Sequence, residues 1–193
     1  LRRAREVKGA GGEYVMIDIL TTGWAAFQTL RDECQDLKLA IHAHRAFHAT
    51  FTRSRKHGIS MLVVADLTRL IGADNLHIGT VIGKLVSPKE EVLALREELE
   101  ENFIHEGNHK LNNNWEGMKK VFAVSSGGLH PGLMPQIVKL LGRDVVIQVG
   151  GGIHGHPKGS YAGAKACRQA LEAIEWSFTL QEYASQHPEL KEA

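Results

Sequence analysis

Histidines and an arginine gather in one short stretch of the chain. Residues 41–48 read Ile-His-Ala-His-Arg-Ala-Phe-His, at the point where an apolar strand is expected to end. Side chains alternate between the two faces of a strand. If the strand runs that far, His42 and His44 point the same way and Arg45 points to the opposite side. Titratable and cationic groups at a strand end suit an anionic, phosphorylated ligand. A polar loop with solvated histidines is the plainer alternative.

Two glycine-rich loops offer a second way to bind an anion. Ser125-Ser-Gly-Gly128 and Gly150-Gly-Gly152 each follow an apolar run. Glycine lets the backbone approach an anion closely, and successive N–H groups can point at it. Either loop alone could be a plain tight turn, but two consecutive loops of this kind favour a phosphate site.

A third loop carries a lysine. His77 ends a weaker apolar run, and the glycine-bounded segment Gly79-Thr-Val-Ile-Gly-Lys84 follows it. A mobile loop with a lysine can close over a substrate and stabilise developing negative charge. Without further context, Lys84 would be an ordinary surface lysine.

Strands and helices alternate along the chain that carries these groups. Strands are predicted at residues 14–20, 38–42, 76–79, 121–124 and 145–149. Helices are predicted at residues 23–37, 59–70, 88–103, 135–141, 162–176 and 180–185, with Pro88 in a first helical turn. Such alternation implies parallel βαβ units and an α/β fold.

Two architectures compete for this pattern. The run Gly150-Gly-Gly152 continues Ile-His-Gly-His-Pro and not as GxGxxG before a helix, which disfavours a dinucleotide-binding fold. In a (β/α)8 barrel the βα loops build the active site, and phosphate is often held after strands seven and eight. Because the glycine-rich loops follow the last two predicted strands, the barrel is favoured, and the five strands would be about strands 4–8.

Composition sets limits on partners and compartment. The 193 residues carry a formal net charge of +1, which argues against bulk attraction to nucleic acid or a membrane surface. No apolar run reaches the roughly 18 residues of a membrane span. Cys34 and Cys167 lie in helical patterns and are expected to be buried thiols of a cytoplasmic protein. The chain begins Leu1-Arg-Arg without methionine, and we expect it to continue a chain that started earlier.

Taken in order, these motifs resemble the large subunit of ribulose-1,5-bisphosphate carboxylase/oxygenase (RuBisCO). The matching segments cover essentially the whole chain: residues 42–48, His57-Gly58, residues 77–85, 126–130 and 148–157. The motifs Gly-Leu-His-Pro at 128–131 and Gly-Ile-His-Gly-His-Pro-Lys-Gly at 152–159 resemble those of the archaeal form III branch. The resemblance implies the C-terminal part of the catalytic barrel domain, residues 1–193.

The resemblance also implies an activity and partners. The parent enzyme would add carbon dioxide to ribulose 1,5-bisphosphate to give two 3-phosphoglycerates, with oxygen as the substrate of a side reaction. It would use Mg2+ and would assemble as a homodimer or a dimer-based oligomer of large subunits.

Site residues follow from the resemblance as well. His44 resembles the histidine that handles protons, and Lys84 the loop lysine that stabilises the added carboxylate. The remaining positions resemble substrate-binding residues: Arg45, His77 and the nearby His48 for one phosphate, the backbone of Gly127, Gly128, Gly150 and Gly151 for the other, Ser126 for the sugar, and Gln148.

The chain departs from the family pattern in two ways. After Lys84-Leu85 the family continues Glu-Gly, whereas this chain has Val86-Ser87, which puts the anchoring of the closed loop in doubt. The family's Lys-Asp-Asp-Glu motif, which supplies the carbamylated lysine and the carboxylate ligands of Mg2+, does not occur in these residues. The metal ligands, the N-terminal α+β domain and the first three barrel strands are therefore expected outside this chain.

Two other functions remain possible on sequence grounds. One is a RuBisCO-like enolase or isomerase of a phosphorylated sugar, although the joint presence of His44, Arg45, His77, Lys84 and Ser126 argues against it. The other is that this polypeptide alone is catalytically inert.

Overall fold

The computed structural model describes residues 1–54, 56–83, 88–107 and 110–193, which form two compact units. Unit 1 comprises residues 1–78 and 94–123, and unit 2 comprises residues 79–93 and 124–193. Each unit has its own core and its own part of a parallel sheet.

The sheet of unit 1 contains β1 (Tyr14–Asp18), β2 (Ala40–His44) and β3 (Asn75–His77), followed by the start of β6 (Phe122–Ser126). β1 and β2 are parallel, with Cα partners running from Tyr14 and Ala40 to Asp18 and His44. β2 and β3 are parallel as well. The predicted α/β class with parallel strands is confirmed.

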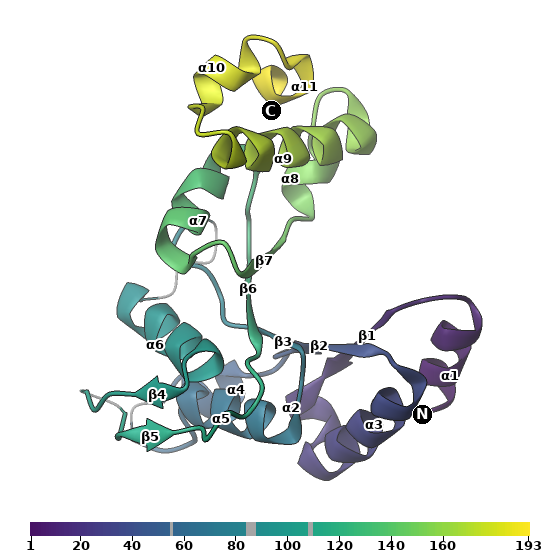
Figure 1. Cartoon of the computed structure of the whole chain (residues 1–193), viewed down its shortest axis with the longest axis vertical. Coiled ribbons are helices and arrows are strands. Elements are labelled where there is room, and N and C mark those ends of the chain that lie inside the picture. The colour runs from purple at the N-terminus through teal and green to yellow at the C-terminus, as the bar shows by residue number, and fades with distance from the viewer. Residues whose placement is uncertain (55, 84–87, 108–109) are drawn as a thin grey trace. The chain divides into compact units, whose positions relative to one another are not determined.

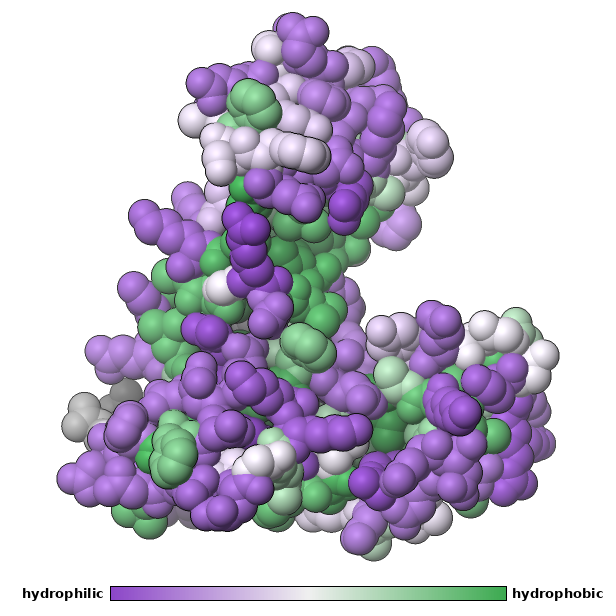
Figure 2. Space-filling view, in the orientation of Figure 1, coloured by the Kyte–Doolittle hydropathy of each residue, from purple (hydrophilic) through white to green (hydrophobic). Residues whose placement is uncertain are grey.

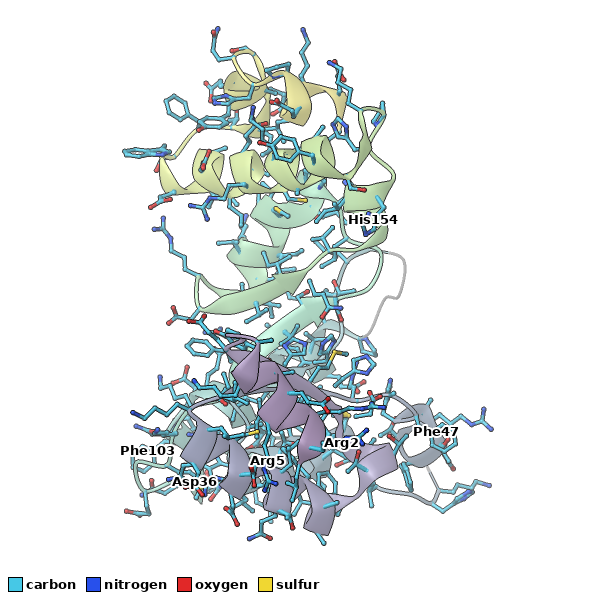
Figure 3. All side chains as sticks on the ribbon, turned by 90° about the vertical axis from the view of Figure 1, so that its right-hand side faces the viewer. Arg2, Arg5, Asp36, Phe47, Phe103 and His154 are labelled. Carbon is cyan, nitrogen blue, oxygen red and sulfur yellow. The ribbon has the colours of Figure 1, made fainter. Side chains whose placement is uncertain are left out.

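Helices precede β1 and follow the strands of unit 1. They are α1 (Arg2–Gly9), α2 (Ile19–Thr22), α3 (Trp24–Leu37), α4 (Ala49–Thr52), α5 (Met61–Ile71) and the end of α6 (Lys89–Glu100). Helices α1 and α3 lie beside β1 (Figure 1). Arg5 of α1 (labelled in Figure 3) joins them, because its guanidinium donates to Glu33 of α3 at 2.6 and 2.9 Å. Lys38, at φ 53°, ends α3 and turns the chain into β2.

In unit 1, a buried arginine joins α5 to the end of α6 and to the loop at 115–119. Arg69 on α5 is 1% exposed and donates to four carbonyl oxygens, those of Glu98, Glu101, Met118 and Lys119. Its guanidinium carbon lies 4.5 Å from the centroid of the Trp115 ring. The last carbonyls of a helix have no partner within it, so Arg69 satisfies the end of α6 and the loop at 115–119 together.

Unit 2 holds the rest of β6, then β7 (Val145–Gln148) and a group of helices. These are a 3-10 turn (Pro131–Leu133), α7 (Met134–Leu141), α8 (Gly151–His154), α9 (Gly159–Glu175), α10 (Leu180–Ala184) and α11 (Pro188–Glu192). Helices α10 and α11 pack on α9 (Figure 1), and Met134, Cys167, Ala170 and Leu190 form a core there. Apolar surface lies over β7 (Figure 2), whose Val145, Val146 and Ile147 are only half-buried.

Several boundaries differ from the prediction. The strand expected at 14–20 ends at Asp18, because residues 19–22 coil into α2. The strand expected at 38–42 lies two residues later, so it includes both His42 and His44. Helix α6 begins at Lys89, so Pro88 precedes its first turn and accepts from the Val92 N–H through its carbonyl.

Some elements were not predicted. The short helices α4, α8 and α11 and the antiparallel pair β4 (Phe103–Ile104) and β5 (Asn113–Asn114) have no counterpart in the sequence analysis. Cys34 and Cys167 are buried free thiols, as predicted. Within the described residues, no helix combines the length and the apolar character needed to cross a membrane.

Candidate functional site

Three histidine rings meet at the carboxyl ends of β2 and β3. His42 and His44 are half-buried and alternate with buried Ile41 and Ala43, so the two histidines share one face of β2 as predicted. Both rings contact the buried His77 edge to face, with centroids 4.7 and 4.6 Å from it. The Nε2 atoms of His42 and His77 are 2.6 Å apart. Adjacent parallel strands thus build a compact imidazole cluster.

A carboxylate completes this cluster. Asp18, the last residue of β1, is the Cα partner of His44, and its Oδ1 lies 2.5 Å from His44 Nδ1. The residue types and their spacing did not predict a role for Asp18. The position at a strand's carboxyl end was the available signal, because parallel strand ends meet at one edge of a sheet.

The turn after β2 carries the remaining basic groups. Arg45 is half-buried and lies beyond the last strand residue, so strand alternation does not determine where its side chain points. His48 Nδ1 is 3.2 Å from Thr52 Oγ1. Burial lowers the pKa of His48, and the charges of Arg45 and His44 lower it further, which favours a neutral imidazole. Phe47 has φ 71° and an outward side chain that is 65% exposed (Figure 3).

Unit 2 brings the two glycine-rich loops together. Gly127 and Gly128 have φ values of 126° and 68°, a conformation that L side chains rarely adopt. A Cβ on Gly152 would lie 2.3 Å from the Leu129 carbonyl oxygen, so the loop at 150–152 sits directly against the loop that follows β6. Gly150 and Gly151 have open space at the position of a Cβ. Successive backbone N–H groups at such a junction suit an anion.

The start of the lysine loop also lies at this junction. Gly83 has φ 110°, and a Cβ there would lie 2.8 Å from the Gly127 carbonyl oxygen. Lys84, Val86 and Ser87 themselves lie outside the described residues. The chain therefore enters the 84–87 segment from a position against the loop of Gly127 and Gly128.

The predicted site residues fall into two groups. His42, His44 and His77 come together in unit 1, and Arg45 and His48 lie in the adjoining turn. The half-buried Ser126, the glycines of both loops and the exposed Gln148 belong to unit 2. Among the residues that the structure describes, no group of three or more His, Cys, Asp and Glu side chains could hold a metal ion.

Comparison with known proteins matches this arrangement to one family. The model of the "Ribulose bisphosphate carboxylase large chain, catalytic domain" matches residues 1–193. A ribulose bisphosphate carboxylase of Methanosarcina barkeri is 54% identical over 195 residues, which cover 100% of this chain and 46% of that protein.

Solved structures give the same result. Octameric RuBisCO from Pyrococcus horikoshii OT3 superposes with a TM-score of 0.89 and 48% identity, covering 99% of this chain and 42% of that one. Dimeric archaeal RuBisCO from Hyperthermus butylicus gives a TM-score of 0.91 and 43% identity, covering 98% and 44%. The chain thus spans less than half the length of these relatives.

Proposed function

The chain belongs to the family of ribulose bisphosphate carboxylase large chains, and on that premise we propose that the full-length protein carrying it carboxylates ribulose 1,5-bisphosphate. The products would be two 3-phosphoglycerates, with oxygenation as a side reaction. The observation that supports the proposal is the cluster of His44 and His77 in the strand ends beside Arg45, because imidazole and guanidinium groups gathered at one sheet edge suit proton transfer next to a phosphorylated substrate.

The substrate would be held at its two phosphates. Arg45 and His77, with His48 nearby, would bind one phosphate, since guanidinium and imidazole groups donate charge-assisted hydrogen bonds to phosphate oxygens. The backbone N–H groups of Gly127, Gly128, Gly150 and Gly151 would bind the other. The positive φ of Gly127 and Gly128 and the contact between the two loops support this assignment. Ser126 and Gln148 would contact the sugar.

The reaction would build negative charge near the cationic side chains and the backbone N–H dipoles of this chain. Addition of carbon dioxide to an enediolate builds negative charge, which fixed donors in a closed site stabilise. His44 would accept and return protons through its ring. Lys84 would stabilise the new carboxylate, and the start of its loop against Gly127 is consistent with that role.

A metal ion would have to be held elsewhere. Mg2+ would supply electrophilic stabilisation of the enediolate oxygens in this family. The described residues offer no three-ligand group for it, so we propose that its ligands, a carbamylated lysine among them, lie outside this chain.

We also propose that the sheet is part of a (β/α)8 barrel, supplying about strands 4–8. On one face of β1, Tyr14 and Met16 are 61% and 59% exposed, and Phe122 of β6 is 48% exposed. The alternate residues Ile41 and Ala43 of the neighbouring β2 are buried. Large apolar side chains along one sheet face require cover, and barrel closure would provide it.

The assembly and compartment are proposals as well. The octameric and dimeric archaeal relatives support a dimer-based oligomer. Two buried free thiols are consistent with a reducing, cytoplasmic setting.

A direct assay tests the activity. Purified full-length protein, incubated with Mg2+, ribulose 1,5-bisphosphate and labelled bicarbonate, should form labelled 3-phosphoglycerate. The Lys84→Ala variant should lose this activity and still exchange the C3 proton of the sugar, because the lysine acts after enolisation. Proton exchange without label incorporation in the wild type would identify an enolase-type enzyme instead. Equal loss of both activities in Lys84→Ala would contradict the role given to the lysine.

A further inference from the structure

The carboxylate of Asp18 contacts a histidine on the neighbouring strand of the sheet. Asp18 occupies the N-cap position of α2, where aspartate usually accepts from the first backbone N–H groups of the helix. It makes no such side-chain capping bond. Its Oδ1 lies instead 2.5 Å from Nδ1 of His44, its partner in the last pair of the β1–β2 ladder. The side chain therefore contacts the histidine instead of capping α2.

This contact determines which nitrogen of His44 carries a proton. An ionised carboxylate only accepts hydrogen bonds, so Nδ1 must donate, whether the ring is neutral or charged. In the neutral ring, Nε2 is then left as the proton acceptor. The backbone pairing of β1 and β2 fixes the distance between the two residues, and the edge-to-face contact with His77 restricts the ring from another side.

We propose that Asp18 is the positioning residue for His44, holding its ring in the Nδ1–H tautomer so that Nε2 can take up and return the proton of the reaction. This inference rests on the proposed function, since it assigns a partner to the histidine given the proton-transfer role. Asp18 acts through His44 and needs no contact with substrate. The His77 ring also faces His44, and His48 lies close enough for its charge to couple to that of His44.

Substitutions of Asp18 in the full-length protein separate this role from a structural one. Asp18→Asn presents an amide N–H that can donate to Nδ1 and so favours the wrong tautomer, whereas Asp18→Ala leaves Nδ1 to water. We expect Asp18→Asn to lower kcat by about 10²-fold, the lower end of what proton-transfer groups contribute. Asp18→Ala should lose less than Asp18→Asn, and Asp18→Glu should restore part of the activity. KM for ribulose 1,5-bisphosphate should stay within about twofold of the wild type, since phosphate contacts are unchanged.

Asp36→Asn is the matched control, because Asp36 is an exposed carboxylate on α3 (Figure 3). It should leave kcat and KM unchanged. Equal kcat for Asp18→Asn, Asp18→Ala and wild type would overturn the inference, as would a loss confined to KM or a loss in Asp18→Ala that exceeds that in Asp18→Asn.

A measurement without turnover distinguishes the failure of this inference from the failure of the proposed function. The ¹⁵N shifts of the His44 ring, assigned by their loss in His44→Gln, report the tautomer directly. The wild type should show protonated Nδ1, and Asp18→Asn should show protonated Nε2. An Nε2–H tautomer in the wild type would refute the inference even if carboxylation is confirmed. The expected tautomers in a protein that does not carboxylate would support the pairing and reject the proposed function alone.

Discussion

Two carboxyl groups in unit 1 are placed where only one can easily ionise. Glu98 of α6 is buried, and its pKa is raised to about 7 by burial and by the neighbouring Asp66 of α5. Burial also raises the pKa of Asp66. Arg69 lies nearby, but its donors point to carbonyl oxygens, including those of Glu98 and Glu101. Asp66 and Glu98 are therefore a buried pair of carboxyl groups that favours sharing one proton.

This couple predicts a pH-dependent loss of stability. A carboxyl whose pKa is 4.5 when unfolded and about 7 when folded binds more protons in the folded state between these values. Stability therefore falls as the pH rises through this window, by roughly 1–3 kcal/mol. We expect Glu98→Gln to flatten this part of the curve of melting temperature against pH in the full-length protein.

Glu90→Gln provides the comparison, because Glu90 is an exposed residue of the same helix. It should retain the wild-type pH dependence. A Glu98→Gln curve parallel to the wild type between about pH 5 and pH 7 would show that the couple does not govern stability there.

Residue types and the family resemblance together predicted the candidate site residues, but not the partner of His44. The alternation of His42 and His44 with apolar residues predicted their common face, and the structure confirms it. The role of Asp18 could not be predicted in the same way, because it depends on the register between β1 and β2. Register is set by the whole ladder and is not visible in either strand alone.

At the level of elements, strong apolar runs predicted the strands well, whereas several short helices and strands were not predicted. Ile19 and Leu20 extend the apolar pattern of β1 and yet begin α2, since burial of Ile19 serves a helix as well as a strand. The β4–β5 pair consists of two residues per strand, and Asn113–Asn114 carries no apolar alternation. Elements of this size form through tertiary contacts, which a local pattern does not contain.

The junction of the two glycine-rich loops gives a prediction at this scale. In Gly152→Ala the new Cβ would lie 2.3 Å from the Leu129 carbonyl oxygen and 2.8 Å from the His130 Cα. Both atoms belong to backbone, so the loops must separate. We expect a destabilisation of about 1–3 kcal/mol and a higher KM for ribulose 1,5-bisphosphate in the full-length protein, measured by thermal unfolding and steady-state kinetics.

Gly9→Ala is a suitable control for this substitution. Gly9 lies in α1, has no positive φ and has no atom within 4 Å of the Cβ position. Alanine there should leave KM unchanged and preserve stability, since alanine favours helix. An unchanged KM in Gly152→Ala would argue against a phosphate site at the loop junction.

At the scale of the whole molecule, the exposed apolar face of β1 tests the barrel. Met16 is 59% exposed in this chain, and a closed barrel would bury it. We expect a cysteine introduced as Met16→Cys to react slowly with a maleimide in native full-length protein and rapidly after denaturation. Cys34 and Cys167 are buried and contribute little background in the native protein, and their labelling after denaturation is subtracted by use of the unsubstituted protein.

Leu111→Cys calibrates that experiment, because Leu111 is 83% exposed outside the sheet. It should react rapidly in the native protein. Equally rapid labelling at both positions would contradict barrel closure over β1.

Arg69 has a consequence for the order in which the chain acquires its structure. Its carbonyl acceptors lie 29 to 50 residues further along the sequence. During synthesis from the N-terminus, α5 leaves the ribosome before any of these acceptors has emerged, and an unbonded guanidinium cannot be buried without a large desolvation cost. The packing around Arg69 must wait until residue 119 has emerged. Unit 1 therefore cannot complete its packing before that point, and a chain that stalls earlier would leave this arginine exposed to solvent.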